Sequence, residues 1–144
     1  MIAARLSIVT LGVEDMSLMR AFYRSLGWPE QSSANDEHAM FLTGGGVLAL
    51  FPLDELARDA NTKPPNTFDG FRGFTLACNL ESREAVDLAF ETLREAGAEI
   101  VKEPEEVFWG GYSGYFIDPE ENYWEVAHNP FVTFDERGGL IASE

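Results

Sequence analysis

Aromatic residues and glycines are concentrated between residues 108 and 115 (FWGGYSGY), and this segment is well suited to cover a flat or cationic ligand. Trp109 and Tyr112 stand on either side of a Gly-Gly pair. The face of an aromatic ring attracts a cation, and a glycine-rich turn can present such rings to a ligand. The alternative is a hairpin turn whose rings pack on the core. We take Trp109 and Tyr112 as candidate ligand-binding residues and leave both alternatives open.

Nucleophilic and metal-binding side chains are scarce. Cys78 is the only cysteine, and the two histidines, His38 and His128, lie far apart in the chain. The sequence has neither a G-x-S-x-G nucleophile motif nor a phosphate-binding glycine loop. Cys78 has no histidine or group of cations near it in sequence, so its expected behaviour is that of a small buried hydrophobic residue rather than a reactive thiol.

The chain is strongly acidic, with 25 acidic and 10 basic residues and a net charge of −15. Its Lys and Arg residues are scattered singly, so we expect neither a nucleic acid nor a membrane surface as a partner. Acidity favours solubility, and the alternative is that it attracts a cationic ligand. A lone cysteine cannot form an internal disulfide, and no signal-peptide or membrane-spanning pattern is present. We therefore predict a cytoplasmic protein.

The first half of the chain predicts a strand, a helix and a pair of strands. Branched apolar residues favour a strand over residues 5–13. The helix that follows carries an apolar stripe with the spacing i, i+3, i+4, i+7, formed by Met19, Phe22, Tyr23 and Leu26. Strands over residues 38–43 and 46–52 are separated by three glycines, and a short helix is expected over residues 53–60.

The second half repeats this order. A strand over residues 71–80 precedes a helix whose stripe lies 67 positions after the first one, at Val86, Ala89, Phe90 and Leu93. Strands are then expected near residues 99–108, 113–118 and 122–128, with turns between them. Two similar units that each leave an apolar face uncovered bury those faces together.

This pattern predicts an α+β fold. We expect two tandem βαβββ modules with mostly antiparallel curved sheets that enclose a concave pocket. The predicted boundaries are residues 1–60 for the first module, 61–70 for a linker, 71–130 for the second module and 131–144 for a C-terminal tail.

Three motifs resemble one known family. Residues 11–16 (LGVEDM), followed by AFY at 21–23 and LGW at 26–28, resemble the opening of the glyoxalase/bleomycin-resistance (vicinal oxygen chelate, VOC) superfamily. Residues 93–98 (LREAGA) resemble the end of its second helix, and residues 115–126 (YFIDPEENYWEV) resemble its final hairpin. The resemblance spans most of the chain and implies the duplicated fold predicted above.

In metal-dependent members of this family, four strand positions supply ligands to one divalent cation, and the metal polarises the substrate. The resemblance places those positions at Ile8, Ala49, Phe74 and Glu125. Only Glu125 has a side chain that can donate to a metal. The resemblance therefore implies a member whose metal site has degenerated, and we predict neither a metal nor another cofactor.

An apolar cup with one carboxylate suits a small organic ligand, either cationic or aromatic. Strand alternation is expected to add Cys78 and Tyr123 to the lining. The first hypothesis is a protein that binds and sequesters such a molecule. The second is a lyase or isomerase of the lactoylglutathione-lyase kind with Glu125 as the catalytic base, and the third is a non-catalytic interaction module. Glu125 could instead be paired with Arg72. Bleomycin-binding relatives imply a homodimer.

Overall fold

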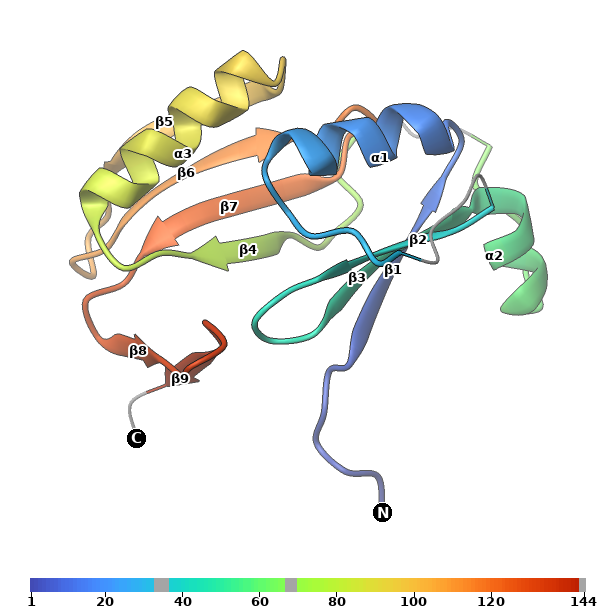
Figure 1. Ribbon diagram of the computed structural model, residues 1–144, viewed down its shortest axis with the longest axis horizontal. Coiled ribbons are helices and arrows are strands. Elements are labelled where there is room, and N and C mark those ends of the chain that lie inside the picture. The colour runs from blue at the N-terminus through green and yellow to red at the C-terminus, as the bar shows by residue number, and fades with distance from the viewer. Residues whose placement is uncertain (33–36, 67–69, 143–144) are drawn as a thin grey trace. The chain divides into compact units, whose positions relative to one another are not determined.

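The computed structural model describes residues 1–32, 37–66 and 70–142 (Figure 1). The chain forms two compact units. Unit 1 contains Met1–Asn66 and Glu136–Gly139, and unit 2 contains Thr67–Asp135 and Leu140–Glu144. Each unit has its own sheet and its own long helix. No helix in the described part of the chain is long and apolar enough to cross a membrane.

Unit 1 is built around a three-stranded sheet with the order β1-β3-β2. Its elements are β1 (Ile8–Val13), α1 (Met16–Ser25), β2 (Ala39–Leu42), β3 (Val47–Pro52) and α2 (Leu53–Asp59). β1 runs parallel to β3, and β2 runs antiparallel to it. The segment at Glu30 adds a short fourth pairing, because Glu30 forms an isolated bridge with Phe41. In unit 1, the strand that should follow α1 in a βαβββ unit is therefore reduced to this single bridge at Glu30.

Helix α1 forms where the sequence predicts it. The Asp15 side chain caps its N-terminus by accepting a hydrogen bond of 3.0 Å from the backbone N–H of Leu18. Gly27 follows the helix with φ +83°, a conformation that glycine adopts without steric cost. Met19 and Tyr23 on the predicted stripe are fully buried, and the ring of Tyr23 lies 5.7 Å from that of Phe41 in β2. α1 therefore covers one face of the unit 1 sheet.

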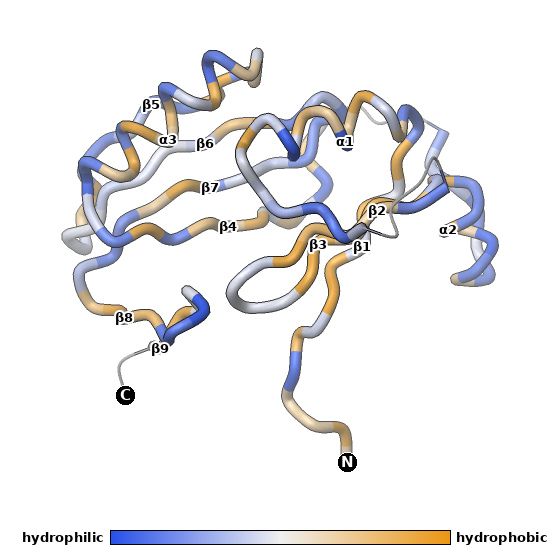
Figure 2. Tube along the Cα trace, in the orientation of Figure 1, coloured by the Kyte–Doolittle hydropathy of each residue, from blue (hydrophilic) through white to orange (hydrophobic). Residues whose placement is uncertain are grey.

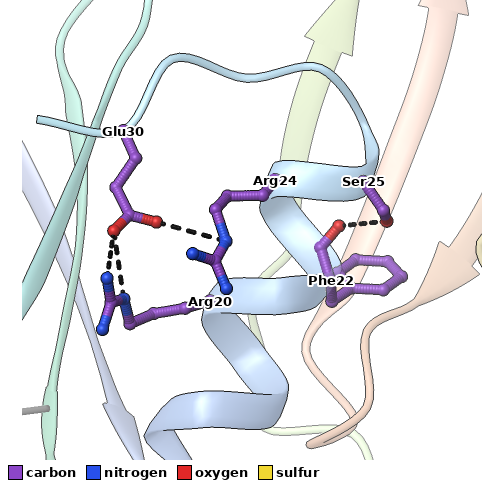
Figure 3. A network of polar contacts seen from close by, with 5 residues as sticks. All are labelled: Arg20, Phe22, Arg24, Ser25 and Glu30. Atoms are coloured by element: carbon purple, nitrogen blue, oxygen red, sulfur yellow. Dashed lines mark hydrogen bonds and ion pairs between the residues drawn. The ribbon is translucent and has the colours of Figure 1, made fainter.

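A half-buried ion-pair network fixes the end of α1 to the segment that pairs with β2 (Figure 3). Arg20 donates two hydrogen bonds to Oε1 of Glu30, at 2.5 and 3.1 Å. Nε of Arg24 lies 3.6 Å from Oε2 of the same carboxylate. Both arginines point toward Glu30 from α1, so the network links the helix to the sheet edge that it packs against.

Unit 2 has the complete predicted βαβββ order. Its elements are β4 (Leu76–Asn79), α3 (Arg83–Glu95), β5 (Glu99–Glu106), β6 (Tyr112–Ile117) and β7 (Tyr123–His128). The sheet order is β4-β7-β6-β5, with β4 parallel to β7 and the other neighbours antiparallel. The last segment, expected only as a tail, forms a hairpin of β8 (Val132–Phe134) and β9 (Leu140–Ala142).

Helix α3 covers one face of the unit 2 sheet. Ser82 caps it through a 3.0 Å hydrogen bond from the backbone N–H of Ala85, an interaction worth about 1 kcal/mol. Figure 2 shows the alternation of hydrophobic and hydrophilic residues along the helix. Phe90 is buried against Gly114 of β6, where an added Cβ would lie 2.6 Å from the Phe90 ring. Burying such a side chain contributes about 2–3 kcal/mol.

Candidate functional site

The face of the unit 1 sheet opposite α1 is apolar and partly exposed. Cα partners in the ladder are Ile8 with Val47 and Thr10 with Ala49. Paired residues project to the same side of a sheet, so Ile8 and Ala49 share this face. Ile8 is 48% exposed, while Ala49 is buried between its neighbours. Of these four paired residues, Thr10 alone has a polar side chain, a hydroxyl.

Helix α2 closes one end of this face at Gly12. A Cβ at residue 12 would come within 2.6 Å of Cδ1 of Leu53 and 3.3 Å of Cδ2 of Leu56. The two leucines of α2 therefore lie directly over the β1 backbone. The glycine allows this close approach, and the result is an apolar rim beside Ile8 and Thr10.

The side chains on this face of unit 1 do not fit the divalent metal that metal-dependent members of the family bind. Ile8 and Ala49 have no donor atom, and their strand neighbours on the same face supply at most a hydroxyl and a thioether, from Thr10 and Met40. A hard or borderline cation needs carboxylate or imidazole ligands. Within the described residues, no three side chains of the His, Cys, Asp and Glu types are grouped so that they could hold a metal ion.

The face of the unit 2 sheet opposite α3 carries Glu125. This residue lies in β7 between Ala77 of β4 and Tyr115 of β6, its partners in the two ladders. The Tyr115 hydroxyl donates a hydrogen bond of 3.1 Å to Oε2 of Glu125. Tyr123 is two positions earlier in the same strand and therefore projects to the same side. We call Ala77, Tyr115, Tyr123 and Glu125 the Glu125 face.

Electrostatics on this face act on the phenol of Tyr115. Burial raises the pKa of Tyr115, and the negative charge of Glu125 and the hydrogen bond to its carboxylate raise that pKa further. Tyr115 is therefore a hydrogen-bond donor at neutral pH. The Glu125 side chain is itself partly buried, and it accepts one hydrogen bond from the residues that the structure describes.

Two cationic side chains considered as partners of Glu125, Lys102 and Arg72, bind other acceptors. Lys102, the β5 partner of Tyr115, forms an ion pair of 3.0 Å with Glu105. Arg72, considered above as a partner of Glu125, donates to Oδ1 of Asn122 at 3.0 Å and to the Glu120 carbonyl at 2.6 Å. In the part of the chain that the structure describes, no ion pair is formed by Glu125. The alternative of an Arg72–Glu125 pair is therefore wrong.

An aromatic wall lies at one end of the Glu125 face. The ring of Phe71 meets that of Tyr123 edge to face, with the centroids 5.3 Å apart. Phe71 is exposed and Tyr123 is half-buried. Tyr115 and Tyr123 project to the same side of the sheet as Glu125, and Phe71 adds a ring next to Tyr123.

Cys78 does not share a face with Glu125, and this prediction is wrong. Its ladder partner in β7 is Val126, whereas the partner of Glu125 is Ala77. Neighbouring residues of a strand project to opposite sides, so Cys78 lies on the α3 side of the sheet. Burial raises the pKa of the Cys78 thiol, and the charge of Glu81 raises it further. The thiol is therefore poorly nucleophilic.

Tyr112 also projects away from Glu125. It belongs to the same alternation as Gly114 and Phe116, which face α3. Its hydroxyl donates a 2.6 Å hydrogen bond to Asp87 of α3, and the Arg83 guanidinium lies 5.4 Å above its ring. These contacts attach the helix to β6, so Tyr112 has a structural role in place of the predicted contact with a ligand on the Glu125 face.

Phe74 and Trp109 lie outside the strands. Phe74 comes before β4, which begins at Leu76, and it is 47% exposed. Gly73 has φ +86° and interrupts the extended backbone that was expected to aim Phe74 at a pocket. Trp109 lies in the β5–β6 turn, where its ring lies against Gly111 and stays 40% exposed. The structure therefore does not bring these two rings into the Glu125 face through a strand.

The sequence analysis missed two residues of the Glu125 face, Tyr115 and Ala77. The position of Tyr115 could have been predicted from the final hairpin, because its turn pairs Ile117 with Tyr123. Counting two residues outward along each strand places Tyr115 opposite Glu125. Ala77 was missed for a different reason, since its pairing depends on the parallel register of β4 and β7, which no local turn sets.

The comparisons with known proteins agree with this fold. The model of the Glyoxalase/Bleomycin resistance protein/Dioxygenase superfamily matches residues 5–126. No curated protein sequence gives a significant match. A glyoxalase-related enzyme from Fulvimarina pelagi is 27% identical, with a TM-score of 0.85, and the match covers 97% of this chain and 99% of that one.

Two further solved structures are similar. A glyoxalase/bleomycin resistance protein/dioxygenase family enzyme from Burkholderia phytofirmans is 27% identical with a TM-score of 0.71, covering 87% of this chain and 98% of that one. A lactoylglutathione lyase from Agrobacterium tumefaciens shares the fold at 24% identity and a TM-score of 0.67, covering 88% and 94%. The chain therefore belongs to the glyoxalase/bleomycin resistance protein/dioxygenase superfamily.

Proposed function

We propose that this protein binds a small organic molecule on the Glu125 face without the metal that its family often uses. The observation that carries the proposal is the setting of Glu125, a partly buried carboxylate with Tyr115 opposite it in β6 and Tyr123 two positions earlier in its own strand. Among the described residues, no group of side chains that could hold a metal includes it. The apolar side chains of Ile8 and Ala49 support it, because the family resemblance implies that metal-dependent relatives carry ligands at these positions, and neither side chain can bind a metal. Sequestration of the bound molecule would be the biological effect.

A thermal-shift screen with a broad library of small organic compounds tests this proposal. A ligand at 100 times its Kd stabilises the folded state by about 2.7 kcal/mol, which raises the Tm of a domain of this size by roughly 5–10 °C. We expect hits whose effect is lost when Ala77 is replaced by Leu, because the larger side chain fills the space beside Glu125. Thr92→Ala on the exposed surface of α3 is the control and should retain every hit. A library without a single reproducible hit would contradict the proposal.

A second candidate function is a lyase or isomerase with Glu125 as the proton-transfer base. The hydrogen bond from Tyr115 favours it, because the phenol holds one carboxylate oxygen and leaves the other accessible to a substrate proton. Two similar structures, at 27% identity, are described as family enzymes. Glu125→Gln should abolish turnover of an identified substrate while the fold is retained. Turnover that survives this change would exclude Glu125 as the base.

We also propose that the protein is a cytoplasmic homodimer, as bleomycin-binding relatives imply. The monomer mass is 16.0 kDa, so light scattering after size exclusion distinguishes the two states directly. A mass that stays at the monomer value at micromolar concentration would contradict the dimer. Neither outcome affects the assignment of the Glu125 face, because its four residues come from one unit of one chain.

A further inference from the structure

We propose that the Glu125 face recognises an organic cation that carries N–H groups, namely a primary ammonium or an amidinium attached to an apolar or aromatic body. This inference deepens the proposed function and rests on it. It assigns the carboxylate of Glu125 as the charge partner of the ligand and the rings of Tyr115 and Tyr123 as the walls that receive the cationic group.

Over residues 1–32, 37–66 and 70–142, no cationic side chain forms an ion pair with the Glu125 carboxylate. One oxygen, Oε2, accepts the hydrogen bond from Tyr115, and across the described residues Oε1 has no hydrogen-bond or ion-pair partner. Lys102 is paired with Glu105, and the Arg72 guanidinium donates to the turn at Glu120 and Asn122. Oε1 is not among the buried polar atoms that lack a partner, so it can be reached from solution. A ligand cation with N–H donors would satisfy the free oxygen and compensate the charge.

The rings beside Glu125 favour the same class of ligand. Tyr115 stands directly opposite Glu125 in the neighbouring strand, and Tyr123 stands on the same side two residues away. A cation over an aromatic face gains about 0.5–1 kcal/mol at an exposed site and more when it is desolvated. Phe71 packs edge to face on Tyr123 and extends the apolar surface that the body of the ligand would contact.

Room for the ligand exists on the β4 side of Glu125. Ala77 is the ladder partner there, and its methyl group is exposed. A larger residue at this position would cover the carboxylate from that side. Glu125 therefore contacts Tyr115 on the β6 side and is open on the β4 side, next to Ala77.

The net negative charge of the chain also favours a cationic ligand. With 25 acidic and 10 basic residues, the chain creates a negative potential that concentrates cations near its surface and repels anions. This long-range effect is not specific. Selectivity therefore depends on the arrangement of Glu125 and the two tyrosines, which the experiment must separate from the general charge.

Two isosteric probes make that separation. Benzylamine is protonated at neutral pH, whereas benzyl alcohol has the same ring and size without the charge. Each is titrated into the full-length protein, and binding is followed by NMR chemical shifts of aromatic and backbone resonances on the Glu125 face. We expect benzylamine to bind at least about tenfold more tightly than benzyl alcohol, because a hydrogen bond between two charged groups is stronger than one to a neutral hydroxyl.

Three variants test the assignment of residues. Glu125→Gln should weaken benzylamine binding by about tenfold and leave benzyl alcohol unchanged. Tyr115→Leu should weaken benzylamine binding roughly twofold to fivefold, and Tyr115→Phe, which keeps the ring, should retain more of the affinity than Tyr115→Leu. Glu91→Gln removes the same charge from an exposed site on α3 and should change neither affinity by more than about twofold.

The outcomes separate this inference from the proposed function. Equal binding of both probes, unaffected by Glu125→Gln, would overturn the cation class while leaving a small-molecule site in place. Equal losses of benzylamine affinity in Glu125→Gln and Glu91→Gln would also overturn the cation class, because the attraction would then come from the general negative charge. Stoichiometric binding of Mn²⁺ that displaces benzylamine would replace the organic cation with a metal. Absence of any hit on this face, from the probes and from the broad library, would reject the proposed function itself.

Discussion

The hydroxyl of Tyr115 donates a hydrogen bond to Oε2 of Glu125 across the β6–β7 ladder, at 3.1 Å. This contact joins the Glu125 carboxylate to a neighbouring ring. It holds the carboxylate in one orientation and leaves its second oxygen accessible. The chemistry proposed for the protein, recognition of a cation or transfer of a proton, depends on this pair.

Glu125→Gln should lower the pKa of Tyr115 toward the usual tyrosine value of about 10, because the substitution removes the charge that disfavours the phenolate. Part of the elevation should persist, since burial is its largest cause. Because the pKa of Tyr115 is raised in the folded state, the neutral phenol contributes to the free energy of unfolding. This contribution is fully present below about pH 10 and is lost as the pH rises through the folded-state pKa. Absorbance of tyrosinate during a pH titration, with Tyr115→Phe as the reference, measures the change. An unchanged Tyr115 pKa in the variant would show that the contact with Glu125 is not formed in solution.

Gly114→Ala should destabilise the protein by about 1–3 kcal/mol. A Cβ at residue 114 would lie 2.6 Å from both the Phe90 ring and the Lys102 carbonyl oxygen, and the backbone carbonyl cannot easily move. Gly45→Ala is the matched control, because a Cβ there meets no atom within 4 Å. Urea denaturation measures both. Equal effects at the two positions would contradict the packing of α3 on β6.

Glu121→Gly should stabilise the protein by roughly 0.5–1 kcal/mol. Glu121 has φ +64°, in the left-handed region that costs a non-glycine residue energy. The turn is otherwise well satisfied, since the buried Asp118 accepts hydrogen bonds from the backbone N–H groups of Glu120 and Asn122. Glu120→Gly, at the neighbouring position, should give no gain. A loss of stability in Glu121→Gly, measured by thermal unfolding, would place the strain elsewhere.

Chelation should leave the protein unchanged. Treatment with EDTA should not lower the Tm, and added Zn²⁺ or Mn²⁺ should shift it by less than about 1 °C, because the Ile8 and Ala49 side chains supply no ligands. Elemental analysis of protein purified without chelators checks the same point. One equivalent of a divalent metal, together with a Tm that falls on chelation, would show that residues outside the family positions hold it.

The sequence alone determined the elements whose signals are local. The apolar stripes of α1 and α3 and the order of strands in unit 2 follow from periodicity within a few residues. The sequence offered both Asp15 and Ser17 as caps of α1, and the structure shows Asp15 in that role. The family motifs are equally local. They indicated the fold, and the family model and the solved structures confirm it.

The tertiary structure decided which side chains share a face. Cys78 and Glu125 were expected together, yet the parallel pairing of β4 with β7 sets Ala77 beside Glu125 and turns Cys78 toward α3. Phe74 was misplaced because the point where β4 begins depends on its partner strand. A shift of one residue reverses the side to which a strand residue projects, and parallel strands have no connecting turn to fix that register. For this reason the chemistry of Glu125 was visible in the sequence, and most of its neighbours were not.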